Sequence, residues 1–376
     1  MKIAINCAFF QPKGGGIKEY IQNLVENLSK LDYENEYILY VLRDNVEYAK
    51  NELKTNFRIK SIPYNGKNLW DIIKRSIFEN FFWIKEEQLE KWDIFHSPFF
   101  HGPTLRNTRL ILTVHDMRFF RYPKTYTFLR YQYLKRAVKS SINRADKIIS
   151  ISEFTKNEIQ AAYGIDEDKI TVIHEAINPE HFGKSKLSLE DNAYIKELKD
   201  VPYILSVGHL EPRKNYDRLI EAFKKIKSRL TSGTKLIIIG KKGHGYESTL
   251  RKIEEDDDVL YLNFVSQGLL NWLYKNSILF VFPSFYEGFG FPPLEAGIHG
   301  AVASVSNVSS MPEVCGDAVS YFNPLDIDDM AQTILQTFNN EQLRQSLKSN
   351  MEERLLKFSW EKNAKETIKL YNSVTI

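Results

Sequence analysis

Cysteine is scarce in this sequence: Cys7 and Cys315 are the only two among 376 residues, and each stands beside an apolar run. Such scarcity argues against a fold held by disulfides and favours buried thiols in a reducing compartment. No apolar run approaches the roughly 20 residues that a membrane-spanning helix needs. The N-terminus has neither the apolar region nor the cleavage site of a signal peptide. We therefore expect a soluble, cytoplasmic protein that could still touch a membrane.

Several function classes are disfavoured by what is missing. No G-x-G-x-x-G follows an apolar run, which disfavours an NAD-linked dehydrogenase. No G-x-S-x-G occurs, which disfavours a serine hydrolase of the α/β type. The net charge of +3 is too small to indicate a nucleic-acid partner.

The length exceeds the size at which a single hydrophobic core stops growing, so two domains with a cleft between them are expected. Short apolar runs alternate with amphipathic helical stretches in both halves, which predicts two parallel sheets. The runs of the first half are KIAINCAFF, YILYVL, DIFHSPF, RLILTVHD and KIISIS, and those of the second are YILSVG, KLIIIG, VLYLNF, ILFVFPS and AVASVS. The helical stretches include residues 17–31, 216–228 and 266–275.

The polar segment from Asn178 to about Asp200 separates the two halves and is interrupted by Pro179 and Gly183. Such composition is typical of a linker. We place the domain boundary near residue 190.

In open α/β sheets, ligands bind at the carboxyl ends of the strands. After the first run comes Lys13-Gly14-Gly15-Gly16, where close backbone approach and a helix N-terminus could receive an anion or a sugar hydroxyl, or where the chain simply turns. His115 and Asp116 end the RLILTV run. The histidine could bind a substrate hydroxyl with its ring oriented by the adjacent carboxylate, or be structural. His96 and His101 are weaker candidates.

The turn after YILSVG presents Gly208, Arg213 and Lys214 just before a helix that Asn215 or Asp217 could cap. Two cations beside a helix start can neutralise a diphosphate and stabilise it as a leaving group. A solvated charge pair is the alternative.

The stretch PSFYEGFGFPPLEA, residues 283–296, follows the apolar strand ILFVF and carries the most information. Glu287-Gly288-Phe289-Gly290 offers a carboxylate and backbone amides that could face phosphate. Pro292-Pro293 begins a helix, which places Glu295 in its first turn, where it could accept from ribose hydroxyls.

Two further polar segments remain ambiguous. Ser306, Asn307, Ser309 and Ser310 could line a base or ribose pocket, or cap the helix near Glu313. Asp326-Ile327-Asp328 has the Asp-x-Asp form of a metal site, but it precedes an amphipathic helix, which favours a capping role.

These residues resemble the retaining glycosyltransferases of family 4, which have the GT-B fold and a Glu-x7-Glu motif within a strand-loop-helix unit. Glu287 and Glu295 have this spacing. The resemblance spans nearly the whole chain, because it also covers the N-terminal glycine loop, TVHD around His115, the Gly208–Asn215 turn, SNVSSMPEV, and the FSW that opens the terminal helix.

The resemblance implies an α/β fold of two facing Rossmann-like domains with parallel sheets and a C-terminal helix crossing back to the first domain. Residues 1–190 would form the acceptor-binding domain, 191–357 the nucleotide-sugar-binding domain, and 358–376 the returning helix.

The resemblance also implies roles for single residues. Arg213 and Lys214 would bind the donor diphosphate, Glu287 the transferred sugar and phosphate, and Glu295 the ribose. His115 would contact the donor sugar near the reacting centre. The expected donor-binding residues are Gly15, Gly16, Gly208, Arg213, Lys214, Glu287, Gly288, Phe289, Gly290, Glu295 and Ser309, and the expected catalytic ones are His115, Glu287, Arg213 and Lys214.

The chemistry implied is transfer with retention by front-face attack, in which the leaving diphosphate takes the acceptor proton. No metal or other cofactor is expected, because Arg213 and Lys214 supply the positive charge that a divalent ion would bring.

From Met117 to Ala145 the chain is basic and aromatic with no acidic residue. Such a helical stretch suits anionic lipid headgroups on the inner face of the cell membrane. The alternative is a helix whose aromatic residues are core and whose cations are merely solvated.

The predicted function is transfer of a hexose from a nucleotide-diphosphate sugar to a glycan in surface polysaccharide assembly. The expected acceptor is a lipid-linked glycan, and the general appearance of the TVHD and FHSP segments suggests GDP-mannose as the donor. A GT-B sugar-nucleotide epimerase and a non-catalytic nucleotide-sugar-binding protein are the alternatives. The Glu-x7-Glu unit with the Arg-Lys turn argues against the epimerase.

Overall fold

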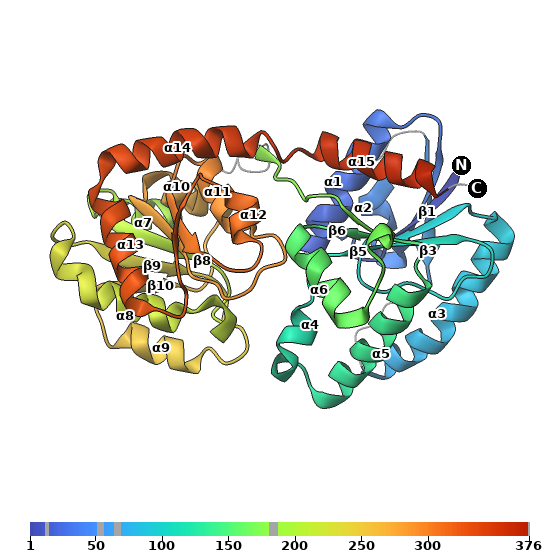
Figure 1. Cartoon of the computed structure of the whole chain (residues 1–376), viewed down its shortest axis with the longest axis horizontal. Coiled ribbons are helices and arrows are strands. Elements are labelled where there is room, and N and C mark those ends of the chain that lie inside the picture. The colour runs from blue at the N-terminus through green and yellow to red at the C-terminus, as the bar shows by residue number, and fades with distance from the viewer. Residues whose placement is uncertain (12–14, 51–55, 64–68, 180–186, 375–376) are drawn as a thin grey trace. The chain divides into compact units, whose positions relative to one another are not determined.

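The structure is a computed structural model, and it describes residues 1–11, 15–50, 56–63, 69–179 and 187–374. The chain forms two compact units, shown in Figure 1. The first unit comprises Met1–Ala176 together with Trp360–Ile376, and the second comprises Ile177–Ser359. The C-terminal helix α15 (Trp360–Ser373) therefore belongs to the first unit and packs on α1 (Gly16–Leu31).

The boundary between the units lies after Ala176 and not near residue 190. Helix α7 (Leu189–Leu198) is the reason, because it packs against α10 (Gln267–Asn276) of the second unit. Its residue Asp191 accepts a hydrogen bond of 2.8 Å from Ser266 Oγ, at the start of α10. Polar composition alone did not distinguish a linker from this polar surface helix.

The first unit is built on a seven-stranded sheet in which every pairing is parallel. The strand order is β3 (Phe57–Ile62), β2 (Glu36–Leu42), β1 (Lys2–Cys7), β4 (Ile94–Ser97), β5 (Arg109–Val114), β6 (Lys147–Ser150) and β7 (Ile170–Val172). Besides α1 and α15, its helices are α2 (Val46–Lys50), α3 (Leu69–Glu90), α4 (Arg118–Arg121), α5 (Phe128–Arg144) and α6 (Glu153–Tyr163).

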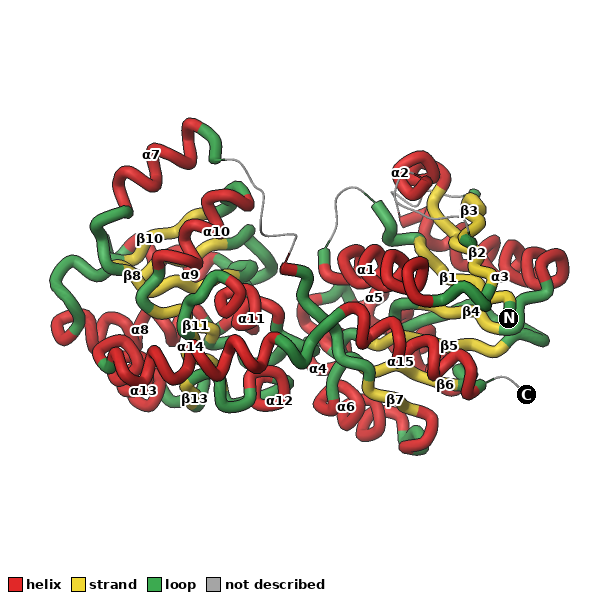
Figure 2. Tube along the Cα trace, turned by 90° about the horizontal axis from the view of Figure 1, so that it is seen from above, coloured by secondary structure: helices red, strands yellow, loops and turns green. Residues whose placement is uncertain are grey.

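The second unit repeats this plan with a six-stranded parallel sheet. The order is β10 (Val259–Leu262), β9 (Lys235–Ile239), β8 (Tyr203–Val207), β11 (Leu279–Phe282), β12 (Ala303–Ser306) and β13 (Ser320–Phe322). Its other helices are α8 (Tyr216–Ile226), α9 (Glu247–Glu254), α11 (Phe291–Ile298), α12 (Met311–Cys315), α13 (Ile327–Asn339) and α14 (Glu341–Leu355). Figure 2 shows helices on both sides of each sheet, which is the doubly wound arrangement predicted from the sequence.

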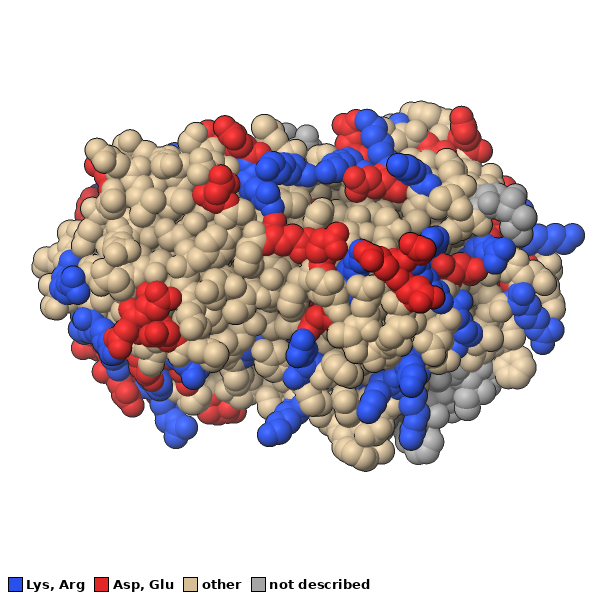
Figure 3. Space-filling model, viewed as in Figure 1, with Lys and Arg blue, Asp and Glu red and all other residues tan. Residues whose placement is uncertain are grey.

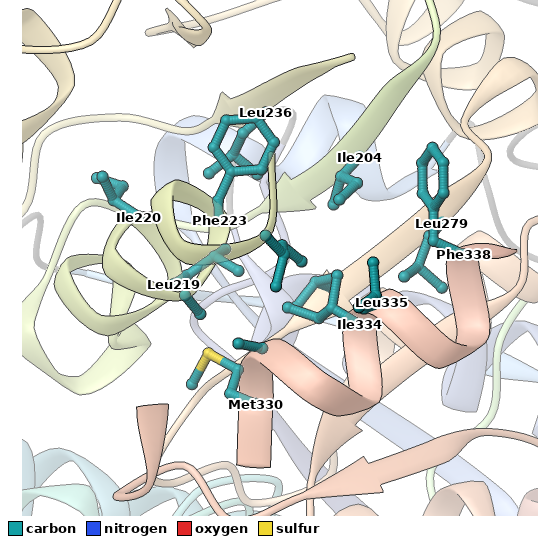
Figure 4. Packing of buried hydrophobic residues seen from close by; sticks show 14 of the residues in the cluster. Ile204, Leu219, Ile220, Phe223, Leu236, Leu279, Met330, Ile334, Leu335 and Phe338 are labelled. Atoms are coloured by element: carbon teal, nitrogen blue, oxygen red, sulfur yellow. The ribbon is translucent and has the colours of Figure 1, made fainter. Parts of the chain in front are cut away.

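The core of the second unit lies between its sheet and the helix pair α8 and α13 (Figure 4). Leu219, Ile220 and Phe223 recur at helical spacing and so form one apolar face of α8. Ile334 and Phe338 do the same on α13, and both faces are buried against Ile204 and other sheet residues. The first unit has an equivalent core around Trp83, Phe95 and Leu112.

Both cysteines are free and buried, as predicted. Among the helices that the structure describes, none has the length and apolar character needed to cross a lipid bilayer.

Candidate active site

In the second unit, the strand order reverses between β8 and β11, which are neighbours in the sheet although two strands separate them in sequence. Such a switch point opens a crevice at the carboxyl ends of the two strands, where ligands of α/β proteins bind. The chain after β8 carries Gly208 and the short helix Pro212–Lys214, and the chain after β11 carries residues 283–290. The topology therefore brings the Arg-Lys turn and the Glu287 loop together.

Glu287 is the centre of this cluster. Its Oε1 accepts hydrogen bonds from Arg213 Nη1 at 2.7 Å, from Lys214 Nζ at 2.8 Å and from Ser284 Oγ at 2.5 Å. The Lys214 ammonium also lies over the Phe282 ring, 4.7 Å from its centre. The side chains of Arg213, Lys214 and Glu287 are only 11%, 10% and 14% exposed, so two cations and one carboxylate are held together nearly out of water.

Burial and charge act in opposite directions on these groups. Burial by itself would raise the pKa of Glu287, but the charges of Lys214 and Arg213 outweigh it and the pKa is lowered. Burial lowers the pKa of Lys214, and Glu287 compensates only in part. A second carboxylate belongs to the cluster, because Glu211 Oε2 lies 3.7 Å from Arg213 Nη2 and the Glu211 side chain is 11% exposed. The two cations are therefore balanced by two carboxylates when all four groups are ionised.

Close backbone packing fixes the Arg-Lys turn. Gly208 N donates to Ile239 O at 2.8 Å, and a Cβ on Gly240 would lie only 2.0 Å from Gly208 O. The turn is joined to the Glu287 loop because Phe285 N donates to Arg213 O at 2.9 Å, and Arg213 Nη1 donates to Tyr286 O at 2.5 Å.

Two capping predictions for α8 are wrong. Asn215 precedes the helix with a positive φ of 59° and makes no side-chain cap; its amide instead donates to Pro324 O at 2.9 Å. Asp217 accepts from the Thr249 hydroxyl. By contrast, Asp326 does cap α13, because it accepts from the backbone N–H groups of Asp328 and Asp329. Within the residues that the structure describes, no three His, Cys, Asp or Glu side chains form a possible metal site.

Helix α11 begins after Gly290, with Pro292 and Pro293 at its start as predicted. Glu295 is the fifth residue of this helix and so lies in its second turn, not in the first. The helix begins at Phe291, one residue before the two prolines. The Glu295 carboxylate accepts from Tyr274 OH at 3.1 Å, which connects α11 to α10.

In the first unit, His115 follows β5 at the carboxyl edge of the sheet. Its Nδ1 lies 2.6 Å from Glu175 Oε1, and its Nε2 lies 3.0 Å from Pro98 O. The prediction that Asp116 orients the His115 ring is wrong, because the Asp116 carboxylate instead accepts a hydrogen bond from Arg118 N at 2.9 Å. Burial would lower the pKa of His115, but Glu175 outweighs it and the pKa is raised.

Comparison with known proteins identifies the family to which this chain belongs. Residues 190–354 match the model described as glycosyl transferases group 1, and residues 14–181 match the model described as glycosyltransferase family 4. The O-antigen chain mannosyltransferase B of Escherichia coli is 31% identical over 281 residues, which are 74% of this chain and 74% of that protein. The chain belongs to the family 4 glycosyltransferases.

A second sequence relative and a solved structure are also similar to this chain. The O-antigen chain mannosyltransferase RfbU of Salmonella typhimurium is 32% identical over 227 residues, 60% of this chain and 59% of that protein. A glycosyltransferase structure from Rickettsia africae has a TM-score of 0.71 at 18% identity, covering 99% of this chain and 98% of that chain. This likeness shows the GT-B fold, as predicted.

In this family 4 glycosyltransferase, the loop that carries Glu287 is held by hydrogen bonds to Ser306, Ser309 and Ser310. Ser306 Oγ donates to Ser284 O at 2.6 Å, and Ser310 Oγ donates to Glu287 O and Phe289 O at 3.0 and 2.8 Å. Ser309, with a positive φ of 58°, accepts from Glu287 N at 3.3 Å. The capping role considered for these hydroxyls is wrong, because Ser310 precedes α12 without a side-chain cap. Ser306 and Ser310 instead hold the Glu287 loop through its carbonyl groups.

The remaining predicted site residues lie at the start of α1. Gly15 is its N-cap residue and Gly16 its first residue, and a Cβ on either would meet nothing within 4 Å. Lys13 and Gly14 of the same loop lie outside the described residues.

His96 is fully buried between Thr113 Oγ1 (2.8 Å) and Tyr371 OH (2.7 Å), and burial lowers its pKa to about 3. Its role is therefore structural.

Sequence reasoning missed Glu175, which is 3% exposed. It lies 60 residues after His115 in a segment without glycine or a motif, so the only available signal was its position just after a short apolar run.

The basic stretch consists of α4 and α5, separated at Pro123. Figure 3 shows Lys and Arg side chains over this part of the first unit. Only some of its aromatic residues belong to the core: Phe119 is buried, whereas Phe128 is 72% exposed. Leu129 beside it is 77% exposed, so the start of α5 is an exposed apolar tip among cations.

Proposed function

We propose that the protein transfers a hexose, with retention, from a nucleotide-diphosphate sugar to a glycan during surface polysaccharide assembly. GDP-mannose is the proposed donor, in keeping with the mannosyltransferase names of two relatives. The observation that carries the proposal is the Arg213–Lys214–Glu287 cluster at the switch point of the second sheet.

The donor diphosphate would bind to this cluster. In the free protein the two cations share the Glu287 carboxylate, so an arriving diphosphate would take over their hydrogen bonds while Glu287 turns to the sugar. The bond between the anomeric carbon and the diphosphate oxygen breaks, and the acceptor oxygen bonds to the same face of that carbon. The acceptor proton passes to the leaving diphosphate, whose growing negative charge Arg213 and Lys214 stabilise. Because these cations supply that charge, we propose that no metal is required.

The other predicted contacts complete the donor site. Glu295 would bind the ribose hydroxyls, and Gly288, Phe289 and Gly290 would bring backbone close to the phosphates and sugar. His115, with Gly15 and Gly16 in the first unit, would contact the donor sugar. The competing epimerase function receives no specific support from this set.

We propose that the acceptor binds to the first unit. A hollow of about 200 Å³ there is lined by hydroxyl, amide and guanidinium groups, including Asn6, Tyr133, Ser140 and Arg144. Such groups suit a glycan, which offers many hydroxyls to hydrogen-bond donors and acceptors. The exposed tip of α5 would dock on anionic lipid at the inner face of the cell membrane, where a lipid-linked acceptor is found.

The test is a transfer assay with labelled GDP-mannose, UDP-glucose and other nucleotide sugars, in excess EDTA, with lipid-linked glycans extracted from bacterial membranes as acceptors. We expect label in the lipid fraction from GDP-mannose, and strongly reduced turnover with Glu287→Ala. The matched control is Asp328→Ala, which removes an exposed carboxylate paired with Lys225. No transfer from any donor, with or without Mn²⁺, would contradict the proposal.

A further inference from the structure

Both ring nitrogens of His115 face oxygen atoms that accept hydrogen bonds. Pro98 O, 3.0 Å from Nε2, is a backbone carbonyl and can only accept. Glu175 Oε1, 2.6 Å from Nδ1, accepts whenever the carboxyl group is ionised. A neutral imidazole carries one N–H and satisfies one such partner, whereas the imidazolium satisfies both. The two partners together therefore select the charged ring.

The pair is enclosed in the first unit. The side chains of His115 and Glu175 are 13% and 4% exposed, and the Tyr20 ring packs edge-on against the imidazole with ring centres 4.8 Å apart. A buried imidazolium needs a partner of opposite charge close by, and Glu175 supplies it. The other titratable groups that act on the ring are Asp116, which follows it, and His96 on β4, which is neutral because burial lowers its pKa to about 3.

The position of Glu175 depends on the last helix of the chain. Asn363 on α15 donates its side-chain amide to His174 O at 2.8 Å, which fixes the residue next to Glu175. Ile173 N donates to Ser150 O at 2.9 Å and fixes the other side. Trp360, the first residue of α15, packs against Tyr20 with ring centres 5.7 Å apart. The C-terminal helix therefore contacts both the segment that carries Glu175 and the ring that covers His115.

We propose that Glu175 is a positioning residue that holds His115 as a doubly hydrogen-bonded imidazolium, and that α15 fixes Glu175 through Asn363. The consequence for transfer rests on the proposed function: a donor-sugar oxygen that takes the place of Pro98 O at Nε2 receives a hydrogen bond from a cation, which is stronger than one from a neutral ring. The charge state itself does not depend on that function.

The test is ¹⁵N NMR of the full chain labelled at histidine nitrogens, with the His115 signals assigned by their loss in His115→Gln. We expect both His115 nitrogens to be protonated near neutral pH, with a titration midpoint above the ordinary value of 6.5. In Glu175→Gln, which keeps the shape and removes the charge, the midpoint falls by at least about one pH unit. In Glu158→Gln, which alters a buried carboxylate paired with Arg121, the His115 midpoint is unchanged.

Two results would overturn the proposal: a single protonated nitrogen on His115 in the wild type, which places the shared proton on Glu175, or an equal midpoint in Glu175→Gln. If Glu175→Gln does not fold, the His115 midpoint is measured in Asn363→Ala instead. This substitution leaves the ionisable groups intact, and we expect a smaller fall of the His115 midpoint in the same direction; an unchanged midpoint contradicts the role of α15.

In transfer assays, Glu175→Gln should lower kcat by about tenfold or more while its pH profile follows the shifted His115 midpoint. A wild type that transfers no sugar but shows the imidazolium would contradict the proposed function alone.

Discussion

Gly240 lies behind the Arg-Lys turn, at the end of β9, with a φ of +153° that few other residues adopt. A side chain there would collide with backbone rather than with a flexible group, because its Cβ would lie 2.0 Å from Gly208 O and 2.5 Å from Gly208 C. The position of Gly208, and through it of Arg213 and Lys214, thus depends on the absence of a Cβ at residue 240.

We predict that Gly240→Ala lowers the free energy of unfolding and weakens nucleotide binding, because β8 and β9 must separate to admit the methyl group. Gly233→Ala is the matched control, since Gly233 also has a positive φ (+79°) but a Cβ there would meet nothing within 4 Å. Urea denaturation should show that Gly240→Ala costs about 1–3 kcal/mol more than Gly233→Ala. Equal costs would show that the turn is not tightly packed.

The site could be predicted from sequence only where its residues follow a strand within one motif. Arg213, Lys214 and Glu287 are found this way, because the carboxyl ends of adjacent parallel strands converge. Glu175 and Asn363 could not be found, because their partners are 60 and 189 residues distant. The second-turn position of Glu295 shows that a motif fixes spacing along the chain more reliably than the start of a helix.

At the scale of secondary-structure elements, the continuous apolar runs became buried strands, but β3, β7 and β13 were not anticipated. β3 has the sequence FRIKSI, in which charged residues interrupt the apolar ones, and it lies at the edge of its sheet. β7 and β13 are only three residues long. Their pairing with longer neighbours, rather than their own composition, makes them strands.

Helix α15 is anchored in the first unit by a buried chain of polar groups. Tyr371 OH contacts His96 Nδ1 at 2.7 Å, and His96 Nε2 contacts Thr113 Oγ1 at 2.8 Å. Thr113 Oγ1 in turn lies 3.3 Å from Tyr20 OH on α1. The C-terminal helix is thus connected through β4 and β5 to the helix that begins at the glycine loop.

We predict that Tyr371→Phe lowers the free energy of unfolding by about 1–3 kcal/mol, because it leaves a buried histidine nitrogen without its partner. The same change at Tyr33, which is 75% exposed, should cost at most about 0.5 kcal/mol. Urea denaturation of both variants provides the measurement. A negligible effect at Tyr371 would mean that apolar contacts alone hold α15.

At the scale of the whole molecule, the exposed tip of α5 has no role in the core or in the proposed donor site. Phe128 and Leu129 are 72% and 77% exposed, and Lys124 and Arg130 flank them in sequence, both exposed. Apolar side chains among cations suit the interface of an anionic bilayer, where the rings enter and the cations meet the headgroups.

We predict that the protein sediments with vesicles containing phosphatidylglycerol and much less with phosphatidylcholine alone. Replacing Phe128 and Leu129 together by serine should lower the bound fraction by about tenfold or more, because two apolar side chains no longer enter the lipid. Leu356→Ser is the control, because Leu356 is 84% exposed in the second unit. Binding that is equal for all three proteins would rule out docking through α5.

Arg213 and Lys214, held by Glu287, are the residues that we propose as the diphosphate site of this glycosyltransferase. Calorimetric titration of nucleotide diphosphates into the protein in excess EDTA measures whether these residues bind the donor. We expect one nucleotide, GDP, to bind with a stoichiometry of about one. We also expect Lys214→Ala to weaken binding by about tenfold or more, the loss of a charged hydrogen bond of about 1.5–3 kcal/mol. Lys225→Ala, which removes an exposed lysine, should bind as the wild type does. Equal affinity in Lys214→Ala and the wild type, or no binding of any nucleotide, would show that these residues do not form the diphosphate site.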